Sequence, residues 1–68
     1  MDLKKYNLNG ILQIRTKSGK ELKGTVAQYC YPEDNEGIDK ESLIIHNLKD
    51  DEYYNLFDTD IETIEFID

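Results

Sequence analysis

The sequence predicts an all-β domain built from five short strands. Apolar and polar residues alternate with a period of two in several short segments, as strands with one buried face require. No segment shows the 3.6-residue periodicity of a long helix, and turn-forming residues separate the alternating segments. The 68 residues suffice for one small core, so residues 1–68 are expected to form a single domain.

The first predicted hairpin joins a strand at Ile11–Lys17 to a longer strand at Lys20–Tyr31. Gly19 lies in the tight turn between them, where glycine supplies the positive φ that short hairpin loops need. Gly24 lies in the interior of the second strand. Because an interior glycine weakens a strand unless the backbone bends or is approached closely, Gly24 is interpreted as the bend of a small barrel.

Three further strands are predicted: Ser42–Leu48, Glu52–Phe57 and Ile61–Ile67. The segment Pro32–Glu41, which precedes them, is a turn-rich, acidic loop. The polar residues 58–60 predict one 3₁₀ turn before the last strand, capped by Asp58. The opening segment, Asp2–Asn9, is predicted to be a short helix or an extended arm.

The composition predicts a cytoplasmic protein. The single cysteine, Cys30, cannot form an internal disulfide, which is typical of a reducing compartment. The N-terminus lacks the apolar core of a secretion signal, and no stretch approaches the roughly 18 apolar residues of a membrane span. We therefore expect no contact with a membrane.

The formal net charge of −7 is distributed unevenly along the chain. Residues 1–30 contain six bases and two acids, whereas residues 31–68 contain two bases and thirteen acids. Proteins that bind nucleic acid need a basic face that displaces counterions from phosphate. The candidate residues for such a face are few: Lys4, Lys5, Arg15, Lys17, Lys20 and Lys23. The simpler interpretation is that these residues lie on a solvated polar face of the strands. The excess of acidic residues over basic ones favours solubility.

The spacing of apolar residues and glycines resembles that of the Sm-like family of SH3-like small barrels. The positions similar to its first motif are Leu12, Ile14, Gly19, Leu22, Gly24, Val26 and Tyr29, and those similar to its second are Leu56, Ile61 and Ile64. The resemblance covers residues 11–67. It implies a five-stranded, strongly bent SH3-like (Sm-like) barrel with a short N-terminal helix or arm.

The chain departs from the family where Sm-like proteins contact RNA. Cys30 stands in place of an aspartate, and Phe57-Asp58 replaces an arginine and a glycine. RNA binding in the manner of the family is therefore not expected. The chain also resembles short acidic bacterial barrels, mostly of unassigned function, through Asp34-Asn35-Glu36 and the ending Ile61-Glu62-Thr63-Ile64-Glu65. One acidic bacterial Sm-like protein inhibits a transcription-termination helicase by occupying its RNA-binding surface, which suggests regulation by acidic mimicry.

No catalytic, cofactor or metal site is expected. The acidic loop offers oxygen ligands for calcium, but an EF-hand loop with its glycine at Gly37 would begin at Pro32 and end at Leu43, where an aspartate and a glutamate are needed. Cys30 and His46 could pair as nucleophile and base, but no third, orienting group is identifiable. A packing role for Cys30 and a surface position or structural hydrogen bond for His46 are favoured.

The leading interpretation is a noncatalytic protein-binding module with an unidentified protein partner. Exposed tyrosine beside acids is typical of protein-binding surfaces, and one of Tyr53 and Tyr54 must lie outside because successive strand residues point to opposite faces. The predicted contact residues are Tyr31, Glu33, Asp34, Asn35, Glu36 and Tyr53. The alternative is weak binding of RNA or single-stranded nucleic acid through the first hairpin, by Arg15, Lys17, Lys20 and Lys23.

Assembly into a ring is not expected. The resemblance implies rings of six or seven subunits, in which the fourth strand of one subunit pairs with the fifth strand of the next. Such a ring would gather a large negative charge, and Glu52, Glu62 and Glu65 would lie at or near the joining edges. We therefore expect a monomer or at most a dimer, with Tyr53 or Phe57 in any dimer contact.

Overall fold

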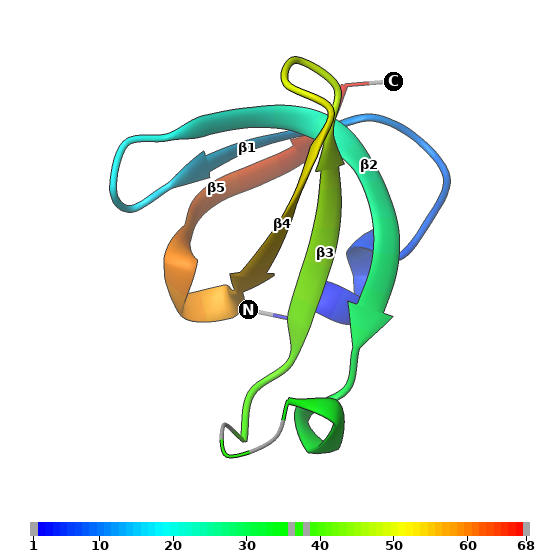
Figure 1. Cartoon of the computed structure of the whole chain (residues 1–68), viewed down its shortest axis with the longest axis vertical. Helices are drawn as coiled ribbons and strands as arrows, with labels where there is room; N and C mark the ends of the chain where they lie inside the picture. Colours follow the sequence, from blue (N-terminus) through cyan, green and yellow to red (C-terminus); the bar gives the residue numbers. More distant parts are fainter. Residues whose placement is uncertain (1, 36, 38, 68) are drawn as a thin grey trace.

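The computed structural model describes residues 2–35, 37 and 39–67. Its strands are β1 (Leu12–Thr16), β2 (Glu21–Cys30), β3 (Ser42–Asn47), β4 (Glu52–Phe57) and β5 (Ile61–Phe66) (Figure 1). The helical elements are single 3₁₀ turns: η1 (Leu3–Tyr6), η2 (Pro32–Asp34) and η3 (Asp58–Asp60). The all-β prediction is therefore confirmed, and the segment before the first strand contains a 3₁₀ turn. No helix in the described part of the chain is long and apolar enough to cross a membrane.

The five strands form one antiparallel sheet in the order β4-β3-β2-β1-β5. β2 serves both halves of this sheet, because residues 21–24 pair with β1 and residues 24–30 pair with β3. Figure 1 shows β2 arching from beside β1 to beside β3. β4 and β5 are the two edge strands, and they do not pair with each other in the described structure. The sheet is therefore not closed into a barrel.

Gly24 is the residue at which β2 changes partners, lying opposite Leu12 on one side and Asn47 on the other. A Cβ atom at Gly24 would lie 2.0 Å from the carbonyl oxygen of His46 and 2.8 Å from its carbonyl carbon. Close approach of two backbones therefore explains the interior glycine. A shift of register follows between Val26 and Gln28, and an irregularity of this kind bends a strand further.

The core fills the inner face of the curved sheet. Its buried members come from all five strands and from η1: Leu3, Leu12, Ile14, Leu22, Leu43, Ile45, Leu56 and Ile61. Leu3 is fully buried although it precedes the sheet, and burial of such a side chain is worth about 1.5–3 kcal/mol. The backbone N–H of Leu3 donates to Glu41 Oε1 at 3.2 Å, so the N-terminal turn is held by both packing and a hydrogen bond.

The turns follow the sequence pattern with one correction. Gly19 has a φ of +93°, as the predicted hairpin turn requires. The 3₁₀ turn between β4 and β5 is present, but the prediction that Asp58 caps it is wrong. The N-cap residue is Phe57, and its N–H donates to Oδ2 of Asp60, the third residue of the turn, at 2.9 Å. In a turn of this length, a carboxylate at the third position reaches back to the N–H that precedes the helix.

Candidate functional site

The residues predicted to contact a partner lie at two ends of the β3–β4 pair. Tyr31 directly follows β2, whose last residue, Cys30, pairs with Ser42 at the start of β3. Tyr53 lies opposite His46, four residues further along β3. At about 3.3 Å per residue, roughly 13 Å of strand separates the two positions. The structure therefore does not bring Tyr31 and Tyr53 into one compact contact surface.

Tyr31 is half-exposed and lies among internal contacts. Its ring meets Tyr29 edge-on, with centroids 5.0 Å apart, and Lys4 Nζ lies 5.5 Å from its ring centroid. The hydroxyl of Tyr29 donates to Glu41 Oε1 at 2.8 Å. This hydrogen bond first, and then burial and the charge of Glu41, raise the pKa of Tyr29 to about 12. Because Glu41 also accepts from the N–H of Leu3, one carboxylate joins the N-terminal turn to the end of β2.

The acidic loop after Tyr31 is organised by its own hydrogen bonds. The side-chain amide of Asn35 donates to the carbonyl of Lys40 at 2.8 Å and to Ser42 Oγ at 3.2 Å. Asp34 accepts from the N–H of Tyr31 at 3.4 Å, and Glu33 is exposed. Glu36, the remaining predicted loop residue, lies outside the described residues. Asp34 and Asn35 thus stabilise the conformation of the loop. Within residues 2–35, 37 and 39–67, no group of three or more His, Cys, Asp or Glu residues is arranged to hold a metal ion.

The outer surface of β3 and β4 presents an aromatic pair. The rings of His46 and Tyr53 stack with centroids 4.9 Å apart, and His46 Nε2 lies 2.5 Å from Asp51 Oδ1. Tyr53 is 64% exposed, whereas Tyr54 packs against the core. The prediction that one tyrosine of this pair lies outside is therefore confirmed, and His46 makes a hydrogen bond at the surface. Cys30, the last residue of β2, is buried opposite Ser42 at the other end of β3, so it does not share a site with His46.

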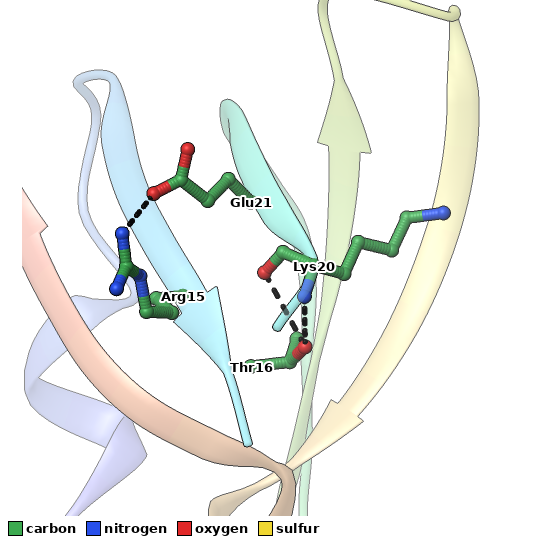
Figure 2. Close-up of polar contacts among 4 residues, drawn as sticks. All are labelled: Arg15, Thr16, Lys20 and Glu21. Carbon is green, nitrogen blue, oxygen red and sulfur yellow. Dashed lines mark hydrogen bonds and ion pairs between the residues drawn. The ribbon is translucent and has the colours of Figure 1, made fainter. Parts of the chain in front are cut away.

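The inner side of β4 is joined to the first hairpin by contacts that the sequence did not reveal. The hydroxyl of Tyr54 donates to Asp50 Oδ2, and the N–H of Glu52 donates to Asp50 Oδ1 at 3.0 Å. These hydrogen bonds, that from Tyr54 first, lower the pKa of Asp50. Lys20 Nζ lies 4.4 Å from the centroid of the Tyr54 ring, at cation–π distance. In Figure 2 the Lys20 side chain extends from the hairpin toward β4.

The four predicted nucleic-acid contacts all lie on or beside the β1–β2 hairpin, and two of them are engaged. Arg15 Nη2 donates to Glu21 Oε1 at 2.5 Å, directly across the hairpin (Figure 2). The pKa of Arg15 is raised, chiefly by this hydrogen bond and also by the charge of Glu62. The hairpin end is fixed by Thr16 Oγ1, which accepts from the N–H of Lys20 at 3.0 Å. Acids therefore interrupt the basic surface. The backbones of the other two lysines join neighbouring strands, because the N–H of Lys17 donates to the carbonyl of Asp60 at 2.9 Å and the N–H of Lys23 donates to Asn47 Oδ1 at 3.2 Å.

Comparison with protein-family models, with curated proteins and with solved structures found no match. The resemblance to Sm-like proteins therefore stays a prediction from motif spacing. Among the described residues, the aromatic side chain with the largest exposed fraction is that of Tyr53, on an edge strand of the sheet.

Proposed function

We propose that this protein is a noncatalytic protein-binding module that contacts its partner through the β4 edge, defined as residues 52–57. The observation that carries the proposal is that β4 is an edge strand with an exposed tyrosine, Tyr53. An edge strand offers unpaired N–H and C=O groups that another polypeptide can pair with. An exposed tyrosine adds a large, rigid contact area at low cost in conformational entropy.

The finer description of the fold belongs to the same proposal. We propose that the curved sheet is an SH3-like small barrel of the Sm-like type that is open between β4 and β5. The long strand β2, shared by both halves, and the 3₁₀ turn η3 between β4 and β5 support this description. The charge of residues 31–68, with thirteen acids and two bases, supports a regulatory role by acidic mimicry of a nucleic acid on a cytoplasmic partner.

Binding of RNA or single-stranded nucleic acid is the second candidate. Its support is the gathering of Arg15, Lys17, Lys20 and Lys23 along one hairpin. Protein binding is favoured over it because the guanidinium of Arg15 is bonded to Glu21 and the ammonium of Lys20 lies over Tyr54. Titration with labelled RNA at low salt separates the two candidates. A complex of micromolar or higher affinity that weakens steeply with added salt would establish the second candidate instead.

Affinity capture with a matched pair of variants tests the proposed function. Tyr53→Ala removes an exposed aromatic side chain from the β4 edge, whereas Leu8→Ala removes an apolar side chain of nearly equal exposure, 62% against 64%, from outside the sheet. The immobilised chain is offered extract of the cells that produce it, with and without nuclease treatment. We expect a protein that survives nuclease treatment, binds the parent and Leu8→Ala equally, and is lost with Tyr53→Ala. Loss of all bound protein after nuclease treatment, or equal capture by both variants, would contradict the proposal.

A further inference from the structure

We infer that the partner of the β4 edge is an extended segment rich in lysine or arginine, which pairs with β4 as an additional strand. This inference rests on the proposed function and names the chemistry of the partner. It has two parts: main-chain pairing along β4, and recognition of positive charge by the carboxylates at both ends of that strand.

β4 is the more receptive of the two sheet edges. It pairs with β3 over six consecutive residue pairs without a shift of register, from Glu52 to Phe57. It contains no proline and no lysine, two of the residues that protect natural edges, and its one charged residue is Glu52 at the first position. β5 differs, because its pairing with β1 shifts register between Arg15 and Thr16. Such an irregularity twists an edge and discourages further pairing.

The length of the receptive edge follows from its ends. In an antiparallel pair, alternate N–H and C=O groups of an edge strand face away from the partner strand. The N–H groups at both ends of β4 already have side-chain acceptors, because the N–H of Glu52 donates to Asp50 Oδ1 at 3.0 Å and the N–H of Phe57 donates to Asp60 Oδ2 at 2.9 Å. Six residues of strand span about 20 Å. The edge therefore fits a short extended segment, about the length of one ordinary strand.

The chain segment that contains β4 is acidic, and the cation described beside it is Lys20, which lies over the ring of Tyr54 on the core side. Residues 50–68 contain eight acids and no base. The acids nearest to the strand flank it at both ends: Asp50, Asp51 and Glu52 before or at its start, and Asp58 and Asp60 directly after it. A segment with cations at its ends is attracted by both groups, whereas an acidic segment is repelled. A second copy of this chain brings a further charge of −7, which disfavours pairing of two β4 edges.

The side chains of β4 determine which residues of the partner segment should be apolar. Tyr54 and Leu56 face the core, and Tyr53 is exposed on the opposite face. A neighbouring strand places its own side chains beside these in the same alternation. Residues of the segment beside Tyr54 and Leu56 would cover the edge of the core. We therefore expect an apolar, alternating centre with basic residues at both ends.

Three matched synthetic peptides test this chemistry with the full chain, labelled with ¹⁵N. All have an alternating valine and threonine centre and blocked termini. The first carries lysines at both ends, the second carries glutamates there, and the third repeats the lysine peptide with N-methylated valines, which cannot donate main-chain hydrogen bonds. Amide chemical shifts of the chain are followed during each titration. We expect the lysine peptide to shift the amides of residues 52–57 and to bind at least about tenfold more tightly than the other two peptides at low salt.

A pair of variants checks the charge contribution on each edge. Glu52 and Glu65 are both exposed glutamates of edge strands, one on β4 and one on β5. We expect Glu52→Gln to weaken binding of the lysine peptide about two- to threefold, as for an exposed charge pair, and Glu65→Gln to leave it unchanged. Added salt should reduce the preference for lysine over glutamate, since salt screens exposed charges.

Several results would overturn the inference. They are equal affinity for the lysine and glutamate peptides, undiminished binding of the N-methylated peptide, shifts confined to β5 or to the β1–β2 hairpin, and absence of shifts at millimolar peptide. Concentration-dependent shifts of residues 52–57 in the free chain would assign the edge to a second copy instead. If capture depends on Tyr53 but the lysine peptide does not shift β4, the proposed function stands and the basic, strand-forming partner is excluded.

Discussion

Substitution of Gly24 by alanine tests the closest packing in the fold. The added Cβ atom would lie 2.0 Å from the carbonyl oxygen of His46, a full ångström inside the 3.0 Å that real Cβ atoms respect. That oxygen belongs to the backbone of β3, opposite the point where β2 changes from one partner strand to the other. The clash can be relieved only if β2 and β3 separate locally, which disturbs both pairing and the core beneath it.

The expected loss of stability is large compared with the free energy of unfolding of a domain of this size. Overpacking usually costs about 1–3 kcal/mol, and a clash with backbone falls at or above the upper end of that range. A domain of 68 residues has a free energy of unfolding of about 3–10 kcal/mol, at about 0.05–0.15 kcal/mol per residue. We therefore expect Gly24→Ala to lower the free energy of unfolding by at least about 3 kcal/mol, and Gly24→Val to lower it further.

Gly19→Ala is the matched control for this prediction. Gly19 also lies in the first hairpin, but a Cβ there meets no described atom within 4 Å, and only its positive φ of +93° opposes the substitution. A left-handed conformation costs a non-glycine residue about 1–2 kcal/mol. In a domain of this size, a loss of 1 kcal/mol lowers Tm by about 4–8 °C.

Thermal and urea unfolding followed by circular dichroism measure both variants. We expect Gly19→Ala to unfold cooperatively with a modestly lower Tm, and Gly24→Ala to lower Tm by more than about 12 °C or to lose the transition altogether. If Gly24→Ala is as stable as Gly19→Ala, the close approach of β2 and β3 does not limit the residue at position 24 and the reasoning fails.

Three further predictions concern assembly, the N-terminal turn and Tyr29. We expect light scattering after size exclusion at physiological salt to give the mass of one or two chains of 8.0 kDa, and a mass six or seven times larger would restore the ring that binds RNA. Leu3→Ala should lower the free energy of unfolding by about 2–4 kcal/mol in urea titration, because it empties a fully buried position; an effect below about 1 kcal/mol would show that η1 is not part of the core. The pKa of Tyr29 is raised to about 12, so its hydrogen bond to Glu41 should stabilise the fold below pH 10 and be lost as pH rises through about 12. Ultraviolet titration of phenolate should show a step near pH 12, and Tyr29→Phe should remove that step; an unchanged titration curve would contradict the assignment.

The existence and limits of the strands could be predicted because the pattern behind them is local. The predicted segment Glu52–Phe57 is β4 without change, and Ile11–Lys17 differs from β1 by one residue at each end. Alternation of apolar residues assigns each side chain to a face wherever the backbone is regular. The prediction was wrong at the cap of η3, where two aspartates of one short turn compete and only the backbone geometry decides that Asp60 reaches the N–H of Phe57.

The candidate site could be predicted only in its parts. Exposed tyrosines and acids are visible in the sequence, but the separation of Tyr31 from Tyr53 depends on how β2, β3 and β4 are paired. The contacts of Glu41 with Leu3 and of Lys20 with Tyr54 join residues more than thirty positions apart. No local pattern specifies such pairs, because each results from the curvature of the whole sheet.

The sequence by itself determined the number of strands, their buried faces and the acidic character of the second half, since alternation, turn chemistry and charge are properties of neighbouring residues. The tertiary structure decided which backbone groups remain unpaired. The strand order β4-β3-β2-β1-β5 makes β4 and β5 the edges. The pairing of β4 with β3 keeps β4 regular, and the position of the core decides that Tyr53 rather than Tyr54 lies outside. Strand order depends on pairing between distant segments and on the energy of the common core, so the β4 edge that we propose as a contact surface exists only once the chain has folded.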